Sequence, residues 1–274
     1  MHTVKAALEE LMESMDRVDA QVIMSHVLGV NRAWIAANPM RILTETEDAK
    51  IDMLAAQRAL GHPIAYLLAR REFYGREFEV TPAVLIPRPE TETLVEAALA
   101  RMADDATCLD LGTGSGAIAI TLACERPRAA ITATDVSADA LALARRNAAA
   151  HGCAARIAFM QGTWYEPVAS RRFAMIVANP PYVAGADEHL ERGDLRFEPR
   201  HALTDGSRDG LDSIRAIVAG ARDHLEPGGW LLFEHGYDQA AAAAHLLAQA
   251  GFSERVSVND LAGIARVAGG KMVP

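Results

Sequence analysis

The apolar residues of the first seventy positions recur at intervals of three and four, the spacing that places them on one face of a helix. One of these runs ends just before Gly29, which is a typical helix stop. Thr44 and Glu47 have the spacing of a capping box at the start of a later helix. The pattern predicts a small all-α domain over residues 1–70, and its separate composition leads us to interpret it as a substrate-docking domain.

Residues 71–88 follow a different pattern, with two short aromatic runs around Phe73 and Phe78 and several prolines behind them. Aromatic and β-branched residues favour strands, whereas proline interrupts them, so this segment is predicted to be a β-hairpin linker. Pro89 then occupies a favourable first position for a helix. We expect the remainder of the chain, residues 89–274, to form a single catalytic domain.

From Ala106 onward, short apolar runs alternate with helix-forming stretches. This alternation is typical of a parallel sheet with helices on both faces, so the predicted fold class is α/β with seven strands. The strands are expected near residues 106–111, 130–134, 155–160, 173–178, 229–234, 253–258 and 264–268. The helices are expected near residues 116–124, 137–150, 208–224 and 238–249.

Composition restricts the partners and the compartment. The net charge of -9 argues against broad nonspecific binding to nucleic acid, which requires clustered Lys and Arg. The three cysteines, Cys108, Cys124 and Cys153, are odd in number and lack paired metal-ligand spacing, so neither a disulfide framework nor a metal site is predicted. No apolar stretch is long enough to span a bilayer. We expect a cytoplasmic monomer with no direct nucleic-acid or membrane partner.

A glycine-rich loop, Asp110-Leu-Gly112-Thr113-Gly114-Ser115-Gly116, connects the first strand of this pattern to a helix. Glycines let a ligand approach the backbone closely, and a helix N-terminus lies just beyond, so we expect main-chain donors to face a cofactor. Asp135 ends the next predicted strand, where a carboxylate can accept from both hydroxyls of a ribose. The loop also loosely satisfies the dinucleotide pattern. Asp110 disfavours a pyrophosphate and suits a cationic amino-acid ligand such as S-adenosylmethionine.

Asn179-Pro180-Pro181-Tyr182 follows the apolar run 173–178. The two prolines lack N–H groups and end the strand, which leaves carbonyls such as that of Pro180 free to accept hydrogen bonds. Asn179 adds a side-chain carbonyl and Tyr182 a flat ring. Together they can hold a planar group that carries an NH2. A strand-ending turn with a half-buried tyrosine is the purely structural alternative.

These motifs resemble those of the class I methyltransferases that use S-adenosylmethionine. Within that group the chain is similar to the release-factor glutamine methyltransferases, also called the HemK family. The resemblance rests on Gly61-His-Pro-Ile-Ala-Tyr66, Arg71-Glu-Phe-Tyr-Gly75, Leu85-Ile-Pro-Arg-Pro-Glu-Thr-Glu92, the loop from Asp110 to Gly116, Asn179 to Tyr182, Arg196-Phe-Glu-Pro199 and Pro227-Gly-Gly229. It implies a Rossmann-like catalytic sheet after a helical domain and a hairpin. It also implies methyl transfer to the side-chain amide nitrogen (N5) of the glutamine in the Gly-Gly-Gln motif of class-I peptide chain release factors.

The resemblance also implies roles for single residues. The loop from Gly112 to Gly116 lines the cofactor, Asp135 holds its ribose, and Trp164 lies beside its adenine. Asn179 and the tetrapeptide that it begins hold the substrate glutamine, with Asn179 also beside the cofactor. Thr163 departs from the family, which commonly carries an aspartate there. Arg88 and Glu198 lie in motifs that flank the site, where they either contact the substrate or stabilise their own loops.

Three other functions are compatible with part of the pattern. Adenine-N6 nucleic-acid methyltransferases also present Asn-Pro-Pro-Tyr to an exocyclic amine, but base-modifying enzymes need a basic cleft and this chain is acidic. A noncatalytic binding protein is disfavoured by the intact motifs. A nicotinamide dehydrogenase is disfavoured because no hydride-transfer site is evident. Glu234, at the end of a predicted strand, is interpreted as a hydrogen-bonding residue of that strand end and not as a catalytic base.

Overall fold

The structure, a computed structural model, describes residues 2–273. The chain divides into two compact units. The first unit contains the residues up to Arg70 together with the short segment Gly193–Phe197, and the second contains Arg71–Arg192 and the residues from Glu198 onward. A segment that is distant in sequence therefore belongs to the N-terminal unit, which the hydrophobic pattern does not indicate.

The first unit is helical, as the apolar spacing predicts. Its helices are α1 (Val4–Ser14), α2 (Arg17–Leu28), α3 (Arg32–Ala37), α4 (Glu45–Ala59), α5 (Ile64–Leu67) and the 3-10 segment η5 (Gly193–Phe197). The predicted capping box at α4 is confirmed, because Thr44 Oγ1 accepts from the Glu47 backbone N–H and the Glu47 carboxylate accepts from the Thr44 N–H. Buried apolar residues such as Ile23, Met24 and Ile51 form the core.

The segment Gly193–Phe197 is attached to this unit by ionic and aromatic contacts. Arg58 donates from Nε to Asp19 over 2.7 Å and from Nη1 to Asp194 over 3.1 Å. The rings of His62 and Phe197 lie 4.4 Å apart, measured between centroids. The segment, Gly-Asp-Leu-Arg-Phe, thus contacts this unit through both an ion pair and an aromatic ring.

The second unit begins with a two-stranded hairpin, β1 (Arg70–Phe73) and β2 (Arg76–Glu79). The strands do not coincide with the aromatic runs 73–75 and 78–80, because Tyr74 and Gly75 form the turn between the two strands. Both turn residues have positive φ, +53° and +71°, as expected at the centre of a tight hairpin turn. Phe73 and Phe78 from the two strands are buried against each other.

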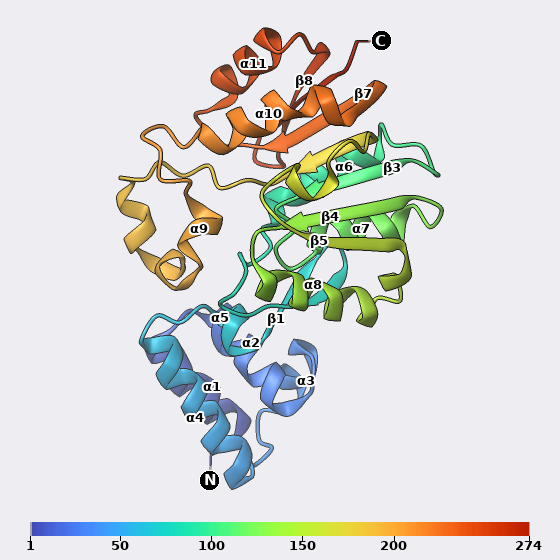
Figure 1. The fold of residues 1–274 in the computed structure, drawn as a ribbon. Coiled ribbons are helices and arrows are strands. Elements are labelled where there is room, and N and C mark those ends of the chain that lie inside the picture. The colour runs from blue at the N-terminus through green and yellow to red at the C-terminus, as the bar shows by residue number, and fades with distance from the viewer. Residues whose placement is uncertain (1, 274) are drawn as a thin grey trace. The chain divides into compact units, whose positions relative to one another are not determined.

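The remaining elements form an α/β sandwich (Figure 1). In its sheet, β9 pairs antiparallel with both neighbours, and the other pairs are parallel. The sheet order is β5-β4-β3-β6-β7-β9-β8. The strands are β3 (Thr107–Leu111), β4 (Ala130–Asp135), β5 (Ile157–Gln161), β6 (Phe173–Ala178), β7 (Leu225–Glu234), β8 (Ser253–Asn259) and β9 (Ala265–Lys271). The longer helices are α6 (Glu92–Leu99), α7 (Ala117–Glu125), α8 (Ala138–Ala150), α10 (Asp212–His224) and α11 (Ala240–Gln249). The shorter ones are η1 (Pro89–Thr91), η2 (Ala154–Arg156), η3 (Glu166–Val168), η4 (Glu188–Glu191) and α9 (Arg200–Leu203).

Two buried clusters cover the two faces of this sheet. Alternate strand residues such as Cys108 and Val177 pack with α6 and α7, whereas Leu109 and Ile176 pack with α10 and α11 on the other face. The period-two alternation of β3 and β6 is hidden in the sequence because both faces are apolar. The sheet order reverses between β3 and β6, and this reversal is where open α/β sheets bind ligands.

One predicted helix boundary is wrong. The sequence favours a helix from residue 208, but α10 begins at Asp212 because Gly210 adopts φ +67° and the preceding residues form a hydrogen-bonded loop. Within residues 2–273, no helix is long and apolar enough to cross a membrane. The same residues hold no group of three or more His, Cys, Asp or Glu arranged to bind a metal ion.

Candidate active site

The glycine-rich loop leaves β3 and leads into α7, and its three glycines at positions 112, 114 and 116 all have positive φ. Gly116 shows why glycine is needed at the helix start. Its φ is +83°, and a Cβ there would lie 2.7 Å from Ile120 Cδ1 and 3.1 Å from Ala144 Cβ. The loop therefore adopts a conformation that other residues reach only with strain, and α7 packs closely beneath it.

Most of the loop's main-chain donors are already used inside the protein. The N–H groups of Gly112 and Thr113 both donate to the Thr134 carbonyl over 2.9 Å, and that of Gly116 donates to Thr113. The Gly114 N–H donates to Asp135 Oδ2 over 2.8 Å. The expectation that these N–H groups face a cofactor is therefore wrong at these four positions. A loop without these free donors is poorly suited to a pyrophosphate, which disfavours the dinucleotide interpretation.

Asp110, near the end of β3, is completely buried. Its Oδ2 accepts from the Thr113 hydroxyl over 2.6 Å, whereas its Oδ1 has no hydrogen-bond partner in the described chain. Burial raises the pKa of Asp110 to about 7, although the hydrogen bond from Thr113 opposes that rise. A nearby cation, such as the cationic end of an amino-acid ligand, would stabilise a carboxylate held in this way.

Asp135, at the end of β4, lines a cavity together with Gly112, Thr163, Trp164 and Asn179. Its two oxygens accept from the backbone N–H groups of Gly114 and Ser137 over 2.8 and 2.9 Å. Each carboxylate oxygen retains a lone pair, so the side chain can still accept from two ligand hydroxyls. The backbone orients this carboxylate before any ligand arrives.

Trp164 lines the same cavity with an unusual backbone. Its φ is +45°, a left-handed conformation that costs energy for a bulky residue and is often found at ligand sites. The Thr134 hydroxyl donates to the Trp164 carbonyl over 3.2 Å. The neighbouring Thr163 also lines the cavity, and its N–H donates to Glu166. The indole thus offers a flat surface to a planar group in the cavity.

Asn179 follows β6 directly, and its position relative to the glycine loop is determined by strand pairing. Leu111 of β3 pairs with Ala178 of β6, so Gly112 and Asn179 leave the sheet side by side. Both residues line the cavity that contains Asp135 and also a second, adjacent cavity that contains Arg88, Thr91 and Ser115. Asn179 Nδ2 donates to Thr91 Oγ1 over 3.1 Å. Its Oδ1 is therefore the end of the carboxamide that remains available to a ligand.

Comparison with known proteins identifies the family. Residues 89–195 match the Methyltransferase small domain family, and residues 1–68 match the PrmC N-terminal domain family. The release factor glutamine methyltransferase of Xylella fastidiosa (strain Temecula1) is 48% identical over 268 residues, which cover 97% of both chains. That of Bordetella pertussis is 51% identical over 259 residues, which cover 93% of this chain and 95% of the relative. The chain belongs to the release factor glutamine methyltransferase family.

The same fold occurs in solved methyltransferases. A methyltransferase from Pyrococcus furiosus is 18% identical with a TM-score of 0.57, and the match covers 80% of this chain and 98% of that one. As a methyltransferase of this family, the protein uses S-adenosylmethionine. The residues present fit that cofactor, because the cavity combines the Asp135 carboxylate with the flat Trp164, and because Asp110, whose Oδ2 accepts from Thr113 of the loop, has an unpartnered Oδ1.

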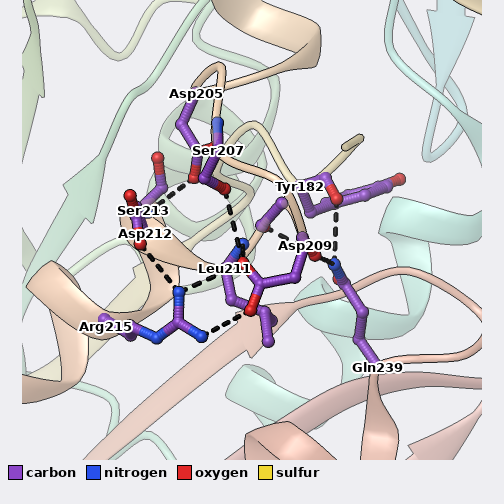
Figure 2. Close-up of polar contacts among 10 residues, drawn as sticks. Tyr182, Asp205, Ser207, Asp209, Leu211, Asp212, Ser213, Arg215 and Gln239 are labelled. Atoms are coloured by element: carbon purple, nitrogen blue, oxygen red, sulfur yellow. Dashed lines mark hydrogen bonds and ion pairs between the residues drawn. The ribbon is translucent and has the colours of Figure 1, made fainter. Parts of the chain in front are cut away.

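Tyr182, the last residue of the tetrapeptide, is held at both ends. Its hydroxyl donates to Glu234 Oε1 over 3.0 Å, and its backbone carbonyl accepts from Gln239 Nε2 over 3.0 Å. Burial raises the pKa of Tyr182, and the negative charge of Glu234 raises it further, so the phenol remains protonated. Figure 2 shows Gln239 directed at the Tyr182 carbonyl beside the loop that contains Asp209.

Arg88 and Glu198 form an ion pair, and the Glu198 carboxylate also accepts from the Ile86 N–H over 2.9 Å. The Glu198 side chain is fully buried, whereas that of Arg88 remains 29% exposed and lines the cavity beside Thr91. The geometry makes Glu198 a support for the segment around Arg88. Of the two residues, Arg88 is the one with surface left to meet a ligand.

Three residues near the tetrapeptide were not selected as site residues from the sequence, namely Thr91, Glu234 and Gln239. Thr91 and Gln239 each resemble an ordinary helix-start residue, and Glu234 ends a buried strand. The signals in the sequence were the position of Thr91 inside the Leu85–Glu92 motif and an acidic residue, Glu234, directly after the apolar run 230–233. Their relation to the site becomes visible only in the structure, where β7 pairs with β6.

Proposed function

We propose that this protein transfers a methyl group from S-adenosylmethionine to the side-chain amide nitrogen (N5) of the glutamine in the Gly-Gly-Gln motif of class-I release factors. The observation that carries the proposal is the direction of the Asn179 carboxamide. Its NH2 group is committed to Thr91, so its carbonyl remains free beside the loop that lines the cofactor cavity. A free carbonyl acceptor at that place suits a substrate NH2 group. The curated relatives carry the name of this activity.

An amide nitrogen is a weak nucleophile because its lone pair is delocalised into the neighbouring carbonyl. When bound, S-adenosylmethionine supplies a methyl carbon that is already strongly electrophilic. The task of the protein is therefore to position the amide and to exclude water. In our proposal Asn179 Oδ1 and the Pro180 carbonyl each accept one amide hydrogen, which fixes the nitrogen in place. Orientation of this kind can contribute several kcal/mol to the lowering of a barrier, on the order of 7–11 kcal/mol at most.

Tyr182 provides the flat surface against which the amide group packs. Its hydroxyl and its carbonyl are both fixed, so the ring has a defined orientation before substrate binds. As the amide nitrogen bonds to the methyl carbon, the bond between that carbon and the cofactor's sulfur would break with its electron pair left on sulfur, and the nitrogen would release one hydrogen as a proton to water. One of the carbonyls that held the amide hydrogens then faces the departing proton. The mechanism requires no base that removes a proton before methyl transfer.

Asp135, Trp164 and the Gly112–Gly116 loop hold the cofactor in this proposal. Asp135 accepts from the ribose hydroxyls, Trp164 lies against the adenine, and Asp110 balances the positive amino-acid end from beneath the loop. Arg88 borders the adjacent cavity and is positioned by Glu198. The cavity lining, which includes Gly112, Asp135 and Trp164, and the two backbone hydrogen bonds that orient the Asp135 carboxylate support these assignments.

The partners and the domain roles are also part of the proposal. We propose that the N-terminal helical region, residues 1–70, docks the release factor, that residues 71–88 act as the linker, and that residues 89–274 perform the methyl transfer. The protein is proposed to act as a monomer in the cytoplasm without binding nucleic acid directly. The net charge of -9 supports the last point, because a nucleic-acid methyltransferase needs a basic surface to hold the phosphate backbone.

The direct test is a radiolabelled methyl-transfer assay with mass spectrometry to locate the label. The acceptors are a class-I release factor, its Gly-Gly-Gln variant with Gln→Ala, and duplex DNA. Label on the glutamine of the unaltered factor alone supports the proposal. Label on DNA supports the adenine-N6 alternative, which shares the Asn-Pro-Pro-Tyr chemistry. Cofactor binding without transfer to any acceptor contradicts the proposal.

A further inference from the structure

We propose that Arg88 binds the carboxylate at the amino-acid end of S-adenosylmethionine, and that Glu198 is the positioning residue that holds Arg88 for this contact. This inference rests on the proposed function for the place of the adenosine, in the cavity lined by Asp135 and Trp164. It gives Arg88 a partner in the cofactor and not in the release factor. The carboxylate is the negatively charged group of the cofactor, whereas Asp110 matches only the positive amino group.

A second cavity can receive the amino-acid end of the cofactor. The cavity that contains Asp135 and the adjacent cavity that contains Arg88 share Gly112 and Asn179 in their walls. S-adenosylmethionine has adenosine at one end and an α-amino acid at the other, with the sulfur between them. A cofactor whose adenosine occupies the first cavity can therefore extend its amino-acid end past Gly112 into the second.

The lining of the second cavity suits a carboxylate. Arg88 is the only arginine or lysine among the described residues that line the two cavities, and the hydroxyl residues Thr91, Thr113 and Ser115 lie with it in the second. A guanidinium can donate two parallel N–H groups to a carboxylate, and such charge-assisted hydrogen bonds are stronger than neutral ones. A neutral glutamine side chain gains less from a cation. The charge of Arg88 therefore favours the cofactor's carboxylate over the Gly-Gly-Gln segment of a release factor.

The ion pair with Glu198 leaves most of the Arg88 guanidinium available. Within residues 2–273, only Nη2 of Arg88 has a hydrogen-bond partner, which is Glu198 Oε1. Arginine has five N–H donors, so Nε and Nη1 can still donate to a ligand. Glu198 Oε2 accepts from the Ile86 N–H over 2.9 Å, so the carboxylate itself is fixed by the backbone. Glu198 thus holds one nitrogen of the guanidinium and leaves the others for the cofactor.

The backbone of Arg88 is fixed as well. Pro87 and Pro89 flank the residue, and a residue before proline is restricted to extended conformations. Arg88 accordingly has φ -99° and ψ 142°. The Pro87 carbonyl accepts from Arg71 Nε over 3.3 Å, and the Arg88 carbonyl accepts from the Thr91 N–H over 3.1 Å. A guanidinium on a fixed backbone loses less conformational freedom when it binds a ligand, which favours tight binding.

The first experiment uses a ligand that differs from the cofactor only in the carboxylate. Decarboxylated S-adenosylmethionine lacks that group and retains the adenosine, the sulfonium and the amino group. In calorimetry, the unaltered protein should bind the decarboxylated compound at least ~10-fold more weakly, the scale of a lost charge-assisted hydrogen bond. Equal affinities for the two compounds would overturn the inference without the need for a variant.

The second experiment assigns this preference to Arg88. Arg88→Met keeps a side chain of similar length and removes the guanidinium. It should weaken S-adenosylmethionine binding by at least ~10-fold and binding of the decarboxylated compound by less than about 2-fold, because only the first compound carries a partner for Arg88. Arg88→Lys keeps the charge and should recover part of the loss. Arg76→Met is the matched control, because Arg76 is also partly exposed, pairs with Glu125 and lines neither cavity.

A double variant guards against a loss of stability. Arg88→Met leaves the buried Glu198 carboxylate without its partner, which can destabilise the fold. Arg88→Met combined with Glu198→Gln removes that unpaired charge, and its thermal unfolding can be compared with that of Arg76→Met. The double variant should show the same loss of preference for S-adenosylmethionine over the decarboxylated compound. An equal loss of affinity for both compounds in the single and double variants would overturn the inference.

A kinetic measurement separates the cofactor from the protein substrate. At saturating S-adenosylmethionine, the KM of Arg88→Met for an intact class-I release factor should stay within about 2-fold of that of Arg76→Met. A large rise in this KM, with an unchanged preference between the two cofactor compounds, would place Arg88 at the protein substrate and overturn the inference. A protein that shows the expected preference but labels no release factor would instead overturn the proposed function alone.

Discussion

The side-chain nitrogen Nε2 of Gln239 lies 3.0 Å from the backbone carbonyl oxygen of Tyr182, although 57 positions separate the two residues. The same nitrogen lies 2.9 Å from the Asp209 carbonyl, and Gln239 Oε1 accepts from the Gly236 N–H over 2.8 Å. Gln239 thus joins the start of α11, the loop before α10 and the end of the tetrapeptide (Figure 2). The position of Tyr182 depends on segments that follow it by several tens of residues.

Gly210 provides a test of that support. A Cβ at this position would lie 2.1 Å from the Tyr182 carbonyl oxygen, so Gly210→Ala must displace the tetrapeptide. We expect kcat to fall by at least ~10-fold, since small displacements of reacting groups are costly. Gly206→Ala is the matched control, because Gly206 has a similar positive φ of +81° but open space around its Cβ. Equal activities of the two variants in the methyl-transfer assay would contradict the assignment.

Asn179→Ala should remove the free carbonyl acceptor and leave the cofactor cavity largely intact. We expect methyl transfer to fall by at least ~100-fold while the S-adenosylmethionine affinity changes by no more than a few fold. Steady-state assays and calorimetry measure the two quantities separately. A variant that remains fully active would remove the basis of the proposed mechanism.

Asp135→Ala should act on cofactor binding. Its carboxylate is oriented by two backbone N–H groups, and its loss strands those donors as well as the ribose hydroxyls. We expect a loss of about 1–3 kcal/mol in S-adenosylmethionine binding. Asp139→Ala is the charge-matched control, because Asp139 lies exposed in the first turn of α8. If both variants bind the cofactor equally well, the ribose is not held by Asp135.

Asp110 gives a prediction about stability and pH. Its pKa in the folded state is raised to about 7 by burial, whereas the unfolded chain releases the proton near the ordinary value of 3.8. Between these values the folded state holds a proton that the unfolded state has lost, so rising pH favours unfolding. The penalty is complete above the folded pKa and is on the order of a few kcal/mol.

Asp110→Asn should remove this penalty. The Tm of the variant without cofactor should therefore exceed that of the unaltered protein by a margin that grows between about pH 4 and pH 7 and is constant above. Thermal unfolding across that range measures the margin. A margin that does not change with pH would show that Asp110 titrates in the folded protein as it does in the unfolded chain.

Deleting residues 1–70 tests the docking role of the helical domain. We expect the apparent KM for an intact release factor to rise far more than the KM for a short Gly-Gly-Gln peptide, because only the intact factor reaches a docking surface. S-adenosylmethionine affinity serves as the control that the truncated protein retains its cofactor site. An equal rise for both substrates would refute docking by this domain.

Much of the fold could be predicted from local sequence patterns. Apolar spacing predicted the helices of the first unit, and the Thr44–Glu47 box at the start of α4 is a contact between near neighbours. The seven strands were also predicted within a few residues of their observed bounds, except that β7 begins earlier, at Leu225. The start of α10 was predicted too early. The backbone of Gly210 lies against the Tyr182 carbonyl, and no local sequence pattern indicates this long-range contact.

For the site, the sequence by itself determined which chemical groups are present: the glycine loop, a carboxylate at the end of β4 and Asn179 to Tyr182 at the end of β6. These motifs are short, and their chemistry depends on residues adjacent in the chain. Only the tertiary structure decided that the loop's N–H groups are consumed internally, that Asn179 turns its NH2 group to Thr91, and that Tyr182 is held by Glu234 and Gln239. The physical reason is that these partners come from turns, strands and helices far apart in the chain, which meet only when the strand order places β3, β6 and β7 side by side.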